Sequence, residues 1–199
     1  MKLEPTPLAG AYVVELERIS DERGWFARTY DPEPLQTAGI EPTNVQSSIS
    51  FNALAGTLRG LHFQEEPHAE DKLVRCTRGA ILDVIVDLRP QSPTYLSHVA
   101  VELSEENRRQ LYVPEMFAHG YLSLTDGAEV AYQVGEFYTP GCERGIRYDD
   151  PALGIEWPIP IEVISDKDAS WPPFEPVVSN AAVSNADRGR KPEPLHVHR

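Results

Sequence analysis

His62 lies in a motif that points to chemistry, the run GTLRGLHFQ at residues 56–64. A neutral imidazole takes up a proton near neutral pH. A phenol such as that of Tyr132 stays protonated there and can deliver a proton. An ammonium such as that of Lys72 stabilises negative charge in a cavity of low dielectric. Together these residue types could move a proton on and off a carbon next to a carbonyl group.

A metal centre is the main alternative use of such a histidine. Metal sites often combine His-x-His with a later Glu and a third His. Here Gln64 stands two residues after His62, and only His119 remains as a plausible second imidazole. Cys76 and Cys142 lack CxxC spacing, which is typical of reduced, buried thiols. The sequence therefore predicts a site without a metal or another cofactor.

Charge and composition narrow the class of partner. The chain has 199 residues and a formal net charge of −13, which argues against a nucleic-acid groove or a membrane surface. No apolar run approaches the roughly 20 residues that span a bilayer. No apolar stretch follows Lys2, so we expect no secretory signal and a cytoplasmic protein.

The apolar pattern predicts an all-β fold. Short runs rich in Val, Ile, Leu and Tyr recur between scattered Pro and Gly residues, which is typical of a sandwich or barrel. Within residues 81–88 the even positions are wholly apolar and the odd ones mix Ile with Asp. One face is therefore core, and the other can carry polar groups into a cavity. The expected strands are residues 12–16, 73–76, 81–88, 98–103, 110–113, 120–124 and 129–134.

Helical signals are few. A capping Asp31, early prolines and Gly39 predict one or two helical turns, and residues 104–109 predict a short turn. From Trp171 onward the apolar periodicity disappears. We therefore expect one domain over residues 1–170 and a polar, partly disordered tail over residues 171–199. His196 and His198 are interpreted as part of that solvated tail.

A series of motifs resembles the dTDP-4-dehydrorhamnose 3,5-epimerase family, in the family's order and over about residues 10–170. Any one of these motifs alone would be weak, but together they are specific. Besides residues 56–64 they are DERGWF (21–26), KLVR (72–75), DVIVDLR (83–89), SPT (92–94), VPEMFAHGY (113–121), ERGIRYDDP (143–151), GIEWP (154–158) and SDKD (165–168).

The resemblance implies a fold, an assembly and a reaction. The fold is a cupin-like, jelly-roll barrel of antiparallel strands with a few short helical turns. The assembly is a homodimer in which an N-terminal strand joins the partner's sheet. The reaction is the epimerisation of a nucleotide-linked 4-keto-6-deoxyhexose through an enolate, with the sugar nucleotide bound in the barrel.

The resemblance also implies residue roles. His62 is the base, and Asp168 fixes its tautomer and steadies the imidazolium. Lys72 holds the charge of the enolate oxygen, and Tyr132 is the acid on the opposite face. His119 helps to polarise the keto oxygen.

Substrate-binding roles fall on five further residues. Arg23, Arg59 and Gln46 would bind the diphosphate or the sugar, with Arg23 reaching across the dimer. Phe26 and Tyr138 are candidates for stacking on the nucleobase. Arg59 and His62 are three residues apart, so a flat strand would point them to opposite faces. Both serve one site only if the strand bends, which Gly60 permits.

Several positions depart from the family pattern, among them Ser47, Ser48, Arg28 and Tyr148. They leave open which nucleobase is bound and whether C3, C5 or both carbons invert. The alternatives are therefore a C3-only epimerase or a 3,4-ketoisomerase of a related nucleotide sugar. A sugar-binding barrel without activity is the non-enzyme alternative.

Overall fold

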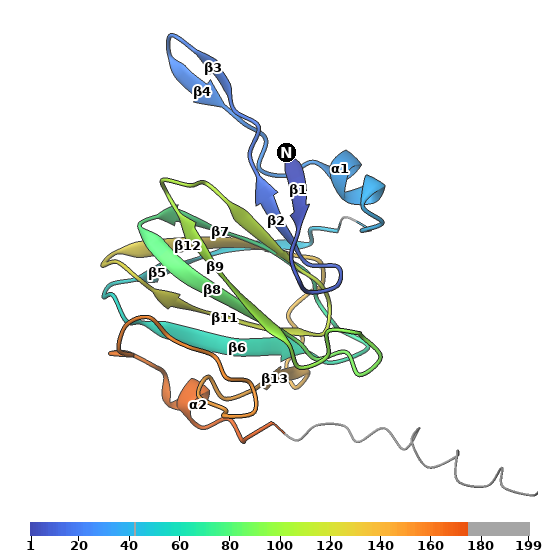
Figure 1. Cartoon of the computed structure of the whole chain (residues 1–199), viewed down its shortest axis with the longest axis vertical. Helices are drawn as coiled ribbons and strands as arrows, with labels where there is room; N and C mark the ends of the chain where they lie inside the picture. The colour runs from blue at the N-terminus through green and yellow to red at the C-terminus, as the bar shows by residue number, and fades with distance from the viewer. Residues whose placement is uncertain (42, 175–199) are drawn as a thin grey trace, which may run out of the picture.

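Two antiparallel sheets form the body of the computed structural model, which describes residues 1–41 and 43–174. Figure 1 shows them facing each other as the two walls of a barrel. The larger sheet has the order β1 (Lys2–Pro5), β2 (Tyr12–Glu15), β10 (Gln110–Val113), β7 (Lys72–Arg78), β12 (Ala128–Val134) and β5 (Gln46–Asn52). The smaller sheet has the order β13 (Glu143–Gly145), β6 (Leu58–Gln64), β11 (Phe117–Ser123), β8 (Ala80–Asp87) and β9 (His98–Ser104).

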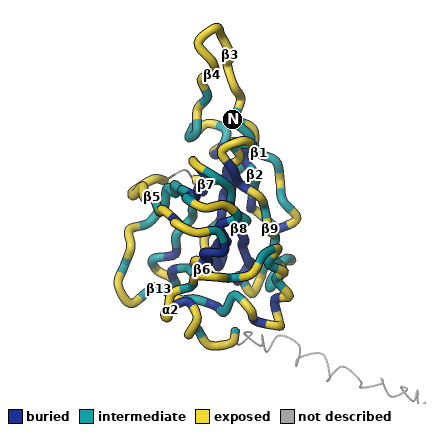
Figure 2. The backbone as a smooth tube through the Cα atoms, turned by 90° about the vertical axis from the view of Figure 1, so that its left-hand side faces the viewer, coloured by how far each residue is buried: buried dark blue, intermediate teal, exposed yellow. Residues whose placement is uncertain are grey.

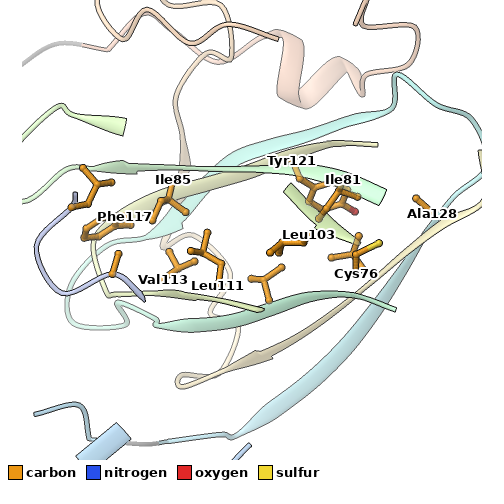
Figure 3. Close-up of a cluster of buried hydrophobic side chains, with 13 residues drawn as sticks. Cys76, Ile81, Ile85, Leu103, Leu111, Val113, Phe117, Tyr121 and Ala128 are labelled. Atoms are coloured by element: carbon orange, nitrogen blue, oxygen red, sulfur yellow. The ribbon is translucent and has the colours of Figure 1, made fainter. Parts of the chain in front are cut away.

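Side chains from both sheets form the core between them. Figure 3 shows Ile81 and Ile85 of β8 pointing into this space, where Leu111 of β10 meets them from the larger sheet. Val84 and Val86, at even positions of β8, are also buried, in a second cluster. The strand is thus covered on both faces, and Asp83 is buried among apolar neighbours. The expected all-β, cupin-like barrel is confirmed.

The helical expectations also hold. Helix α1 covers Pro32–Thr37, and the side chain of Asp31 caps it by accepting a hydrogen bond from the Glu33 backbone N–H. Such a cap satisfies one of the donors that a helix leaves free at its N-terminus. Residues 105–107 form a turn between β9 and β10.

A two-stranded hairpin, β3 (Ile19–Asp21) and β4 (Gly24–Phe26), stands away from the barrel (Figure 1). Its residues are exposed, as Figure 2 shows. The Trp25 ring lies 5.0 Å from the Arg18 guanidinium, which shields part of the ring. Ile19 and Phe26 remain 70% and 63% exposed, which is unusual for large apolar side chains.

The last described segment is held against the smaller sheet. Val163 pairs with Thr57, just before β6, and the Leu58 N–H donates to the Val163 carbonyl at 2.8 Å. Helix α2 (Asp166–Ala169) follows and lies beside β6 (Figure 1). Phe174 packs against the cluster around Val84. Residues 171–174 of the expected tail therefore contact the barrel, while residues 175–199, with His196 and His198, lie outside the described residues.

No helix within the described part of the chain is long and apolar enough to cross a membrane.

Candidate active site

A cavity of about 510 Å³ opens between the two sheets. The smaller sheet contributes β6 and β11 to its wall, and the larger sheet contributes β7 and β12. The chain leading into α2 closes one side. The lining residues are Thr57, Leu58, Arg59, His62, Gln64, Glu70, Lys72, His119, Gly120, Tyr121, Tyr132, Tyr138, Glu143, Val163, Ile164, Ser165 and Asp168.

His62 and Asp168 form a close pair at this cavity. The distance from His62 Nε2 to Asp168 Oδ1 is 2.6 Å, and Asp168 is buried. An ionised carboxylate only accepts hydrogen bonds, so Nε2 carries the hydrogen, which leaves the lone pair of the neutral ring on Nδ1. On that side the nearest acidic atom is Glu143 Oε1, 3.9 Å from Nδ1.

The local fold positions Asp168 at the imidazole. Ser165 caps α2 by accepting a hydrogen bond from the Asp168 N–H at 3.1 Å, and the Gly60 N–H donates to Asp168 Oδ2 at 3.3 Å. Burial alone would raise the pKa of Asp168, but the hydrogen bond and charge of His62 and the Gly60 N–H lower it below its usual value. The carboxyl group is therefore ionised at neutral pH.

A bulge in β6 places Arg59 and His62 on the same cavity. His62 pairs with His119 of β11, whereas Arg59 pairs with Tyr121, so β6 has one residue more than its partner between these pairs. Gly60 has φ +111° there, and a Cβ on it would lie 2.5 Å from the Cα of Gly120. The bend that the three-residue spacing requires is thus present, and glycine is needed for it.

Lys72 enters the cavity from the larger sheet beside an acidic partner. Its Nζ lies 2.9 Å from Glu70 Oε1, and both side chains are largely buried. Gln64 Nε2 donates to the other oxygen of Glu70 at 3.2 Å. Nζ of Lys72 also donates to the His62 carbonyl at 3.4 Å. Lys72 is therefore oriented by a carboxylate and by the backbone of the strand that carries the imidazole.

A second imidazole–carboxylate pair borders the same cavity. His119 Nε2 is 2.7 Å from Asp83 Oδ1, and Asp83 is fully buried. The other carboxylate oxygen, Oδ2, has no hydrogen-bond partner in the described structure. Two residues further along β11, the Tyr121 hydroxyl lies 2.7 Å from that of Ser50. Burial raises the pKa of this phenol, so it stays protonated.

Tyr132 and His62 reach the cavity from opposite sheets. Tyr132 belongs to β12 of the larger sheet and also packs against the core, whereas His62 belongs to β6 of the smaller sheet. Tyr138 lines the cavity near its mouth, and its N–H donates to the Gln46 side-chain oxygen at 3.0 Å. Gln46 itself is exposed and does not line the cavity.

Arg23 and Phe26 do not reach the cavity within one chain. Both belong to the projecting hairpin, where Arg23 forms an ion pair with Asp21. Neither is among the cavity-lining residues.

Sequence reasoning missed several residues at the site. Three of them are acidic partners of the predicted residues: Glu70 of Lys72, Asp83 of His119 and Glu143 of His62. Each acidic residue lies within or close to one of the family motifs, but nothing in the linear pattern shows which basic residue it contacts. Trp171, assigned to the tail, packs edge-on to the His62 ring. The signal available for Trp171 was a large aromatic residue three positions after Asp168, in a segment otherwise poor in apolar residues.

Among residues 1–41 and 43–174, no group of three or more His, Cys, Asp and Glu side chains is placed to hold a metal ion. The expectation of a site without a metal or another cofactor stays a prediction.

Two facing antiparallel sheets around a cavity that carries charged and polar side chains define a cupin-like barrel with an internal site for a small molecule. The family model for dTDP-4-dehydrorhamnose 3,5-epimerase matches residues 5–176. A curated protein of that name from Methanothermobacter thermautotrophicus is 46% identical over 172 residues, which cover 85% of this chain and 92% of the relative.

Solved structures agree. The dTDP-4-dehydrorhamnose 3,5-epimerase of Elizabethkingia anophelis has a TM-score of 0.85 at 40% identity, covering 87% of this chain and 96% of that one. The enzyme of Bacillus anthracis, solved with TDP and PPi bound, has a TM-score of 0.83 at 41% identity and coverage of 87% and 99%. The chain belongs to the dTDP-4-dehydrorhamnose 3,5-epimerase family. The resemblance carried by its motifs is confirmed, and so is the enzyme class, a carbohydrate epimerase.

Proposed function

We propose that this chain inverts C3 and C5 of dTDP-4-dehydro-6-deoxy-D-glucose, with His62 as base and Tyr132 as acid. The observation that carries the assignment of roles is their placement on opposite walls of one cavity, with Lys72 between the same sheets. In a gluco-configured chair, the hydrogens on C3 and C5 are axial on one face. One base can therefore reach both carbons, and one acid on the other side can complete both inversions.

Each inversion follows the same steps. Nδ1 of His62 takes the proton from carbon, and the electron pair of the broken C–H bond moves into an enolate whose negative charge lies on the C4 oxygen. The Lys72 ammonium stabilises that oxygen, and Asp168 stabilises the imidazolium. The Tyr132 hydroxyl then protonates carbon from the opposite face. Proton exchange with water returns His62 to the neutral ring and Tyr132 to the phenol.

Binding of the nucleotide would use the cationic and aromatic groups near the mouth. Arg59 donates to Asn52 Oδ1 at 2.8 Å and to the Phe51 carbonyl, which holds the guanidinium at the cavity. A guanidinium presents paired donors to phosphate oxygens. Tyr138 lines the cavity with a side chain that is 58% exposed, a position open to a nucleobase.

The direct test follows solvent hydrogen during turnover. The purified chain is incubated with dTDP-4-keto-6-deoxyglucose in deuterated water, and the sugar is read by NMR. Deuterium at both C3 and C5 supports the proposal. Deuterium at C3 alone makes the chain a C3 epimerase, and a 3,4-keto shift makes it a ketoisomerase.

We further propose a homodimer in which the N-terminal part of one chain completes the site of the other. The supporting features are the projecting hairpin with exposed Ile19 and Phe26 and the edge strand β5, where Ile49 and Phe51 are 62% and 57% exposed. Apolar surface of this kind is typical of an interface. Arg23 and Phe26 would then reach the partner's cavity.

Subunit mixing tests this arrangement. Arg23→Ala and His62→Asn chains are each expected to have low activity. In a mixed dimer, one of the two sites has both native residues, so random mixing should restore roughly one quarter of the wild-type rate. Activity that stays at the level of the separate variants would contradict a site shared between subunits.

The cytoplasmic location stays a prediction.

A further inference from the structure

Trp171 contacts the imidazole that the proposed function uses as its base. The His62 and Trp171 ring centroids are 6.2 Å apart, and the ring planes meet at 67°, an edge-on arrangement. Asp168, three residues earlier, binds Nε2 of the same imidazole. One short segment therefore holds the ring through a carboxylate and also through an indole.

A glycine on the neighbouring strand makes room for this indole. Gly145 of β13 is the register partner of His62 on β6. Partners in an antiparallel pair project their side chains on the same face. Gly145 has no side chain, and a Cβ there would lie 2.5 Å from Cδ2 of Trp171. The indole thus fills the place beside the imidazole that a side chain at position 145 would take.

The indole is anchored but does not line the substrate cavity. The Phe174 N–H donates to Asp150 Oδ2 at 2.6 Å, which fixes the chain just beyond Trp171. The Lys167 ammonium lies 5.8 Å from the centre of the indole ring system. Trp171 is absent from the described lining of the cavity. Its Nε1–H is buried and has no hydrogen-bond partner among residues 1–41 and 43–174, so the aromatic body of the ring makes the contact with His62.

We propose that Trp171 is a positioning residue for His62, with Gly145 as the gap that admits it. The proposal rests on the proposed function, in which His62 is the base. Contact with the indole restricts rotation of the imidazole, so that Nε2–H stays on Asp168 while Nδ1 remains free for the substrate. Without this contact the ring can turn away from the geometry that proton transfer requires.

Three variants test the contact through the rate. Trp171→Ala should lower kcat about 10-fold to 100-fold, because small misplacement of a catalytic group has effects of that order. KM should stay within about twofold, since Trp171 does not line the cavity. Trp171→Phe keeps a smaller aromatic ring in place of the indole and loses no hydrogen bond within the described structure, so it should stay within about threefold of wild type. Gly145→Ala, which displaces the indole, should lower kcat like Trp171→Ala.

The double variant separates positioning from general damage. In the Trp171→Ala background the indole atoms nearest to the added methyl at position 145 are gone, so Gly145→Ala should cause no further loss. Additive losses would refute the proposal. If Trp171→Ala does not fold, Gly145→Ala decides alone, because it keeps the indole in the chain. A wild-type kcat in Gly145→Ala would overturn the proposal.

A readout without turnover completes the test. Nitrogen-15 NMR of His62 should report a single Nε2–H tautomer in the wild-type chain and a mixture of tautomers in Trp171→Ala and Gly145→Ala. A merely structural role would lower the melting temperature and leave the tautomer unchanged, which would refute the proposal. If the tautomer changes as expected but the wild-type chain does not epimerise the sugar, the proposed function fails and the positioning role stands.

Discussion

Replacing Asp168 with Asn should disable the proposed base in two ways. The substitution removes the charge that stabilises the imidazolium, 2.6 Å from Nε2. It also offers an NH₂ group where an acceptor stood. Because the Gly60 N–H faces the other oxygen, the amide oxygen of Asn is expected to turn to Gly60 and its NH₂ to His62. Nε2 would then have to accept, which moves the ring proton to Nδ1 and blocks the base.

The size of the effect follows from the geometry. A hydrogen bond of this length places the charge centres ~4 Å apart, where two unit charges interact by about 4 kcal/mol at an effective dielectric of ~20. The His62 side chain is 29% exposed, so solvent reduces this to roughly 2–3 kcal/mol. That corresponds to about 30-fold to 150-fold in kcat before the change of tautomer is counted. We therefore expect a loss of at least about 100-fold.

The assay compares kcat for epimerisation with the affinity for dTDP. Asp168→Asn should bind dTDP like the wild-type chain, because the change lies at the reacting end of the cavity. Ser165→Ala is the matched comparison: it removes the hydrogen bond that helps to position Asp168 but keeps the carboxylate, so its loss in kcat should be smaller than that of Asp168→Asn. A kcat for Asp168→Asn within threefold of wild type, with dTDP binding retained, would refute the reasoning.

Two further predictions concern stability. Gly60→Ala should lower the free energy of unfolding by more than ~2 kcal/mol, because the new Cβ meets the Gly120 backbone at a positive φ. Gly141→Ala, at a positive φ with open space, is the control in denaturant titrations, and equal losses would contradict a role for the close approach. Burial alone would raise the pKa of Asp87, but hydrogen bonds, first from Arg89, lower it to about 2. This lowered pKa contributes about 2 kcal/mol to the free energy of unfolding above pH ~4, and the contribution is lost as the pH falls toward 2. The free energy of unfolding of Asp87→Asn should therefore depend less on pH in that range, and an unchanged pH dependence would contradict this prediction.

The repeated short apolar runs predict the barrel because the apolar pattern of each strand is set by that strand's own residues. The alternation in residues 81–88 predicts the apolar even positions as core, and Val84 and Val86 are buried as expected. It does not reveal that Ile81 and Ile85 on the odd face are fully buried as well, since that cover comes from strands of the other sheet.

The site was only partly accessible from the sequence. The three-residue spacing of Arg59 and His62 predicts that a flat strand would point them to opposite faces, and the glycine at position 60 indicates where the strand could bend. Only the register of β6 against β11 shows that the bend is present. Trp171 reaches His62 from the tail only because residue 145 on β13 is a glycine and leaves room for the indole. No linear motif joins positions 145 and 171. Such pairs exist only once the chain returns across the barrel.

His62 and Tyr132 are proposed to act from opposite faces of the bound sugar, His62 as the base and Tyr132 as the acid. One measurement separates these two roles. In deuterated water, Tyr132→Phe should exchange hydrogen for deuterium at C3 with no change of configuration, because the imidazole returns deuterium to the face it attacked. His62→Asn should neither exchange nor invert. Inverted product from Tyr132→Phe, or label in the sugar with His62→Asn, would contradict the account.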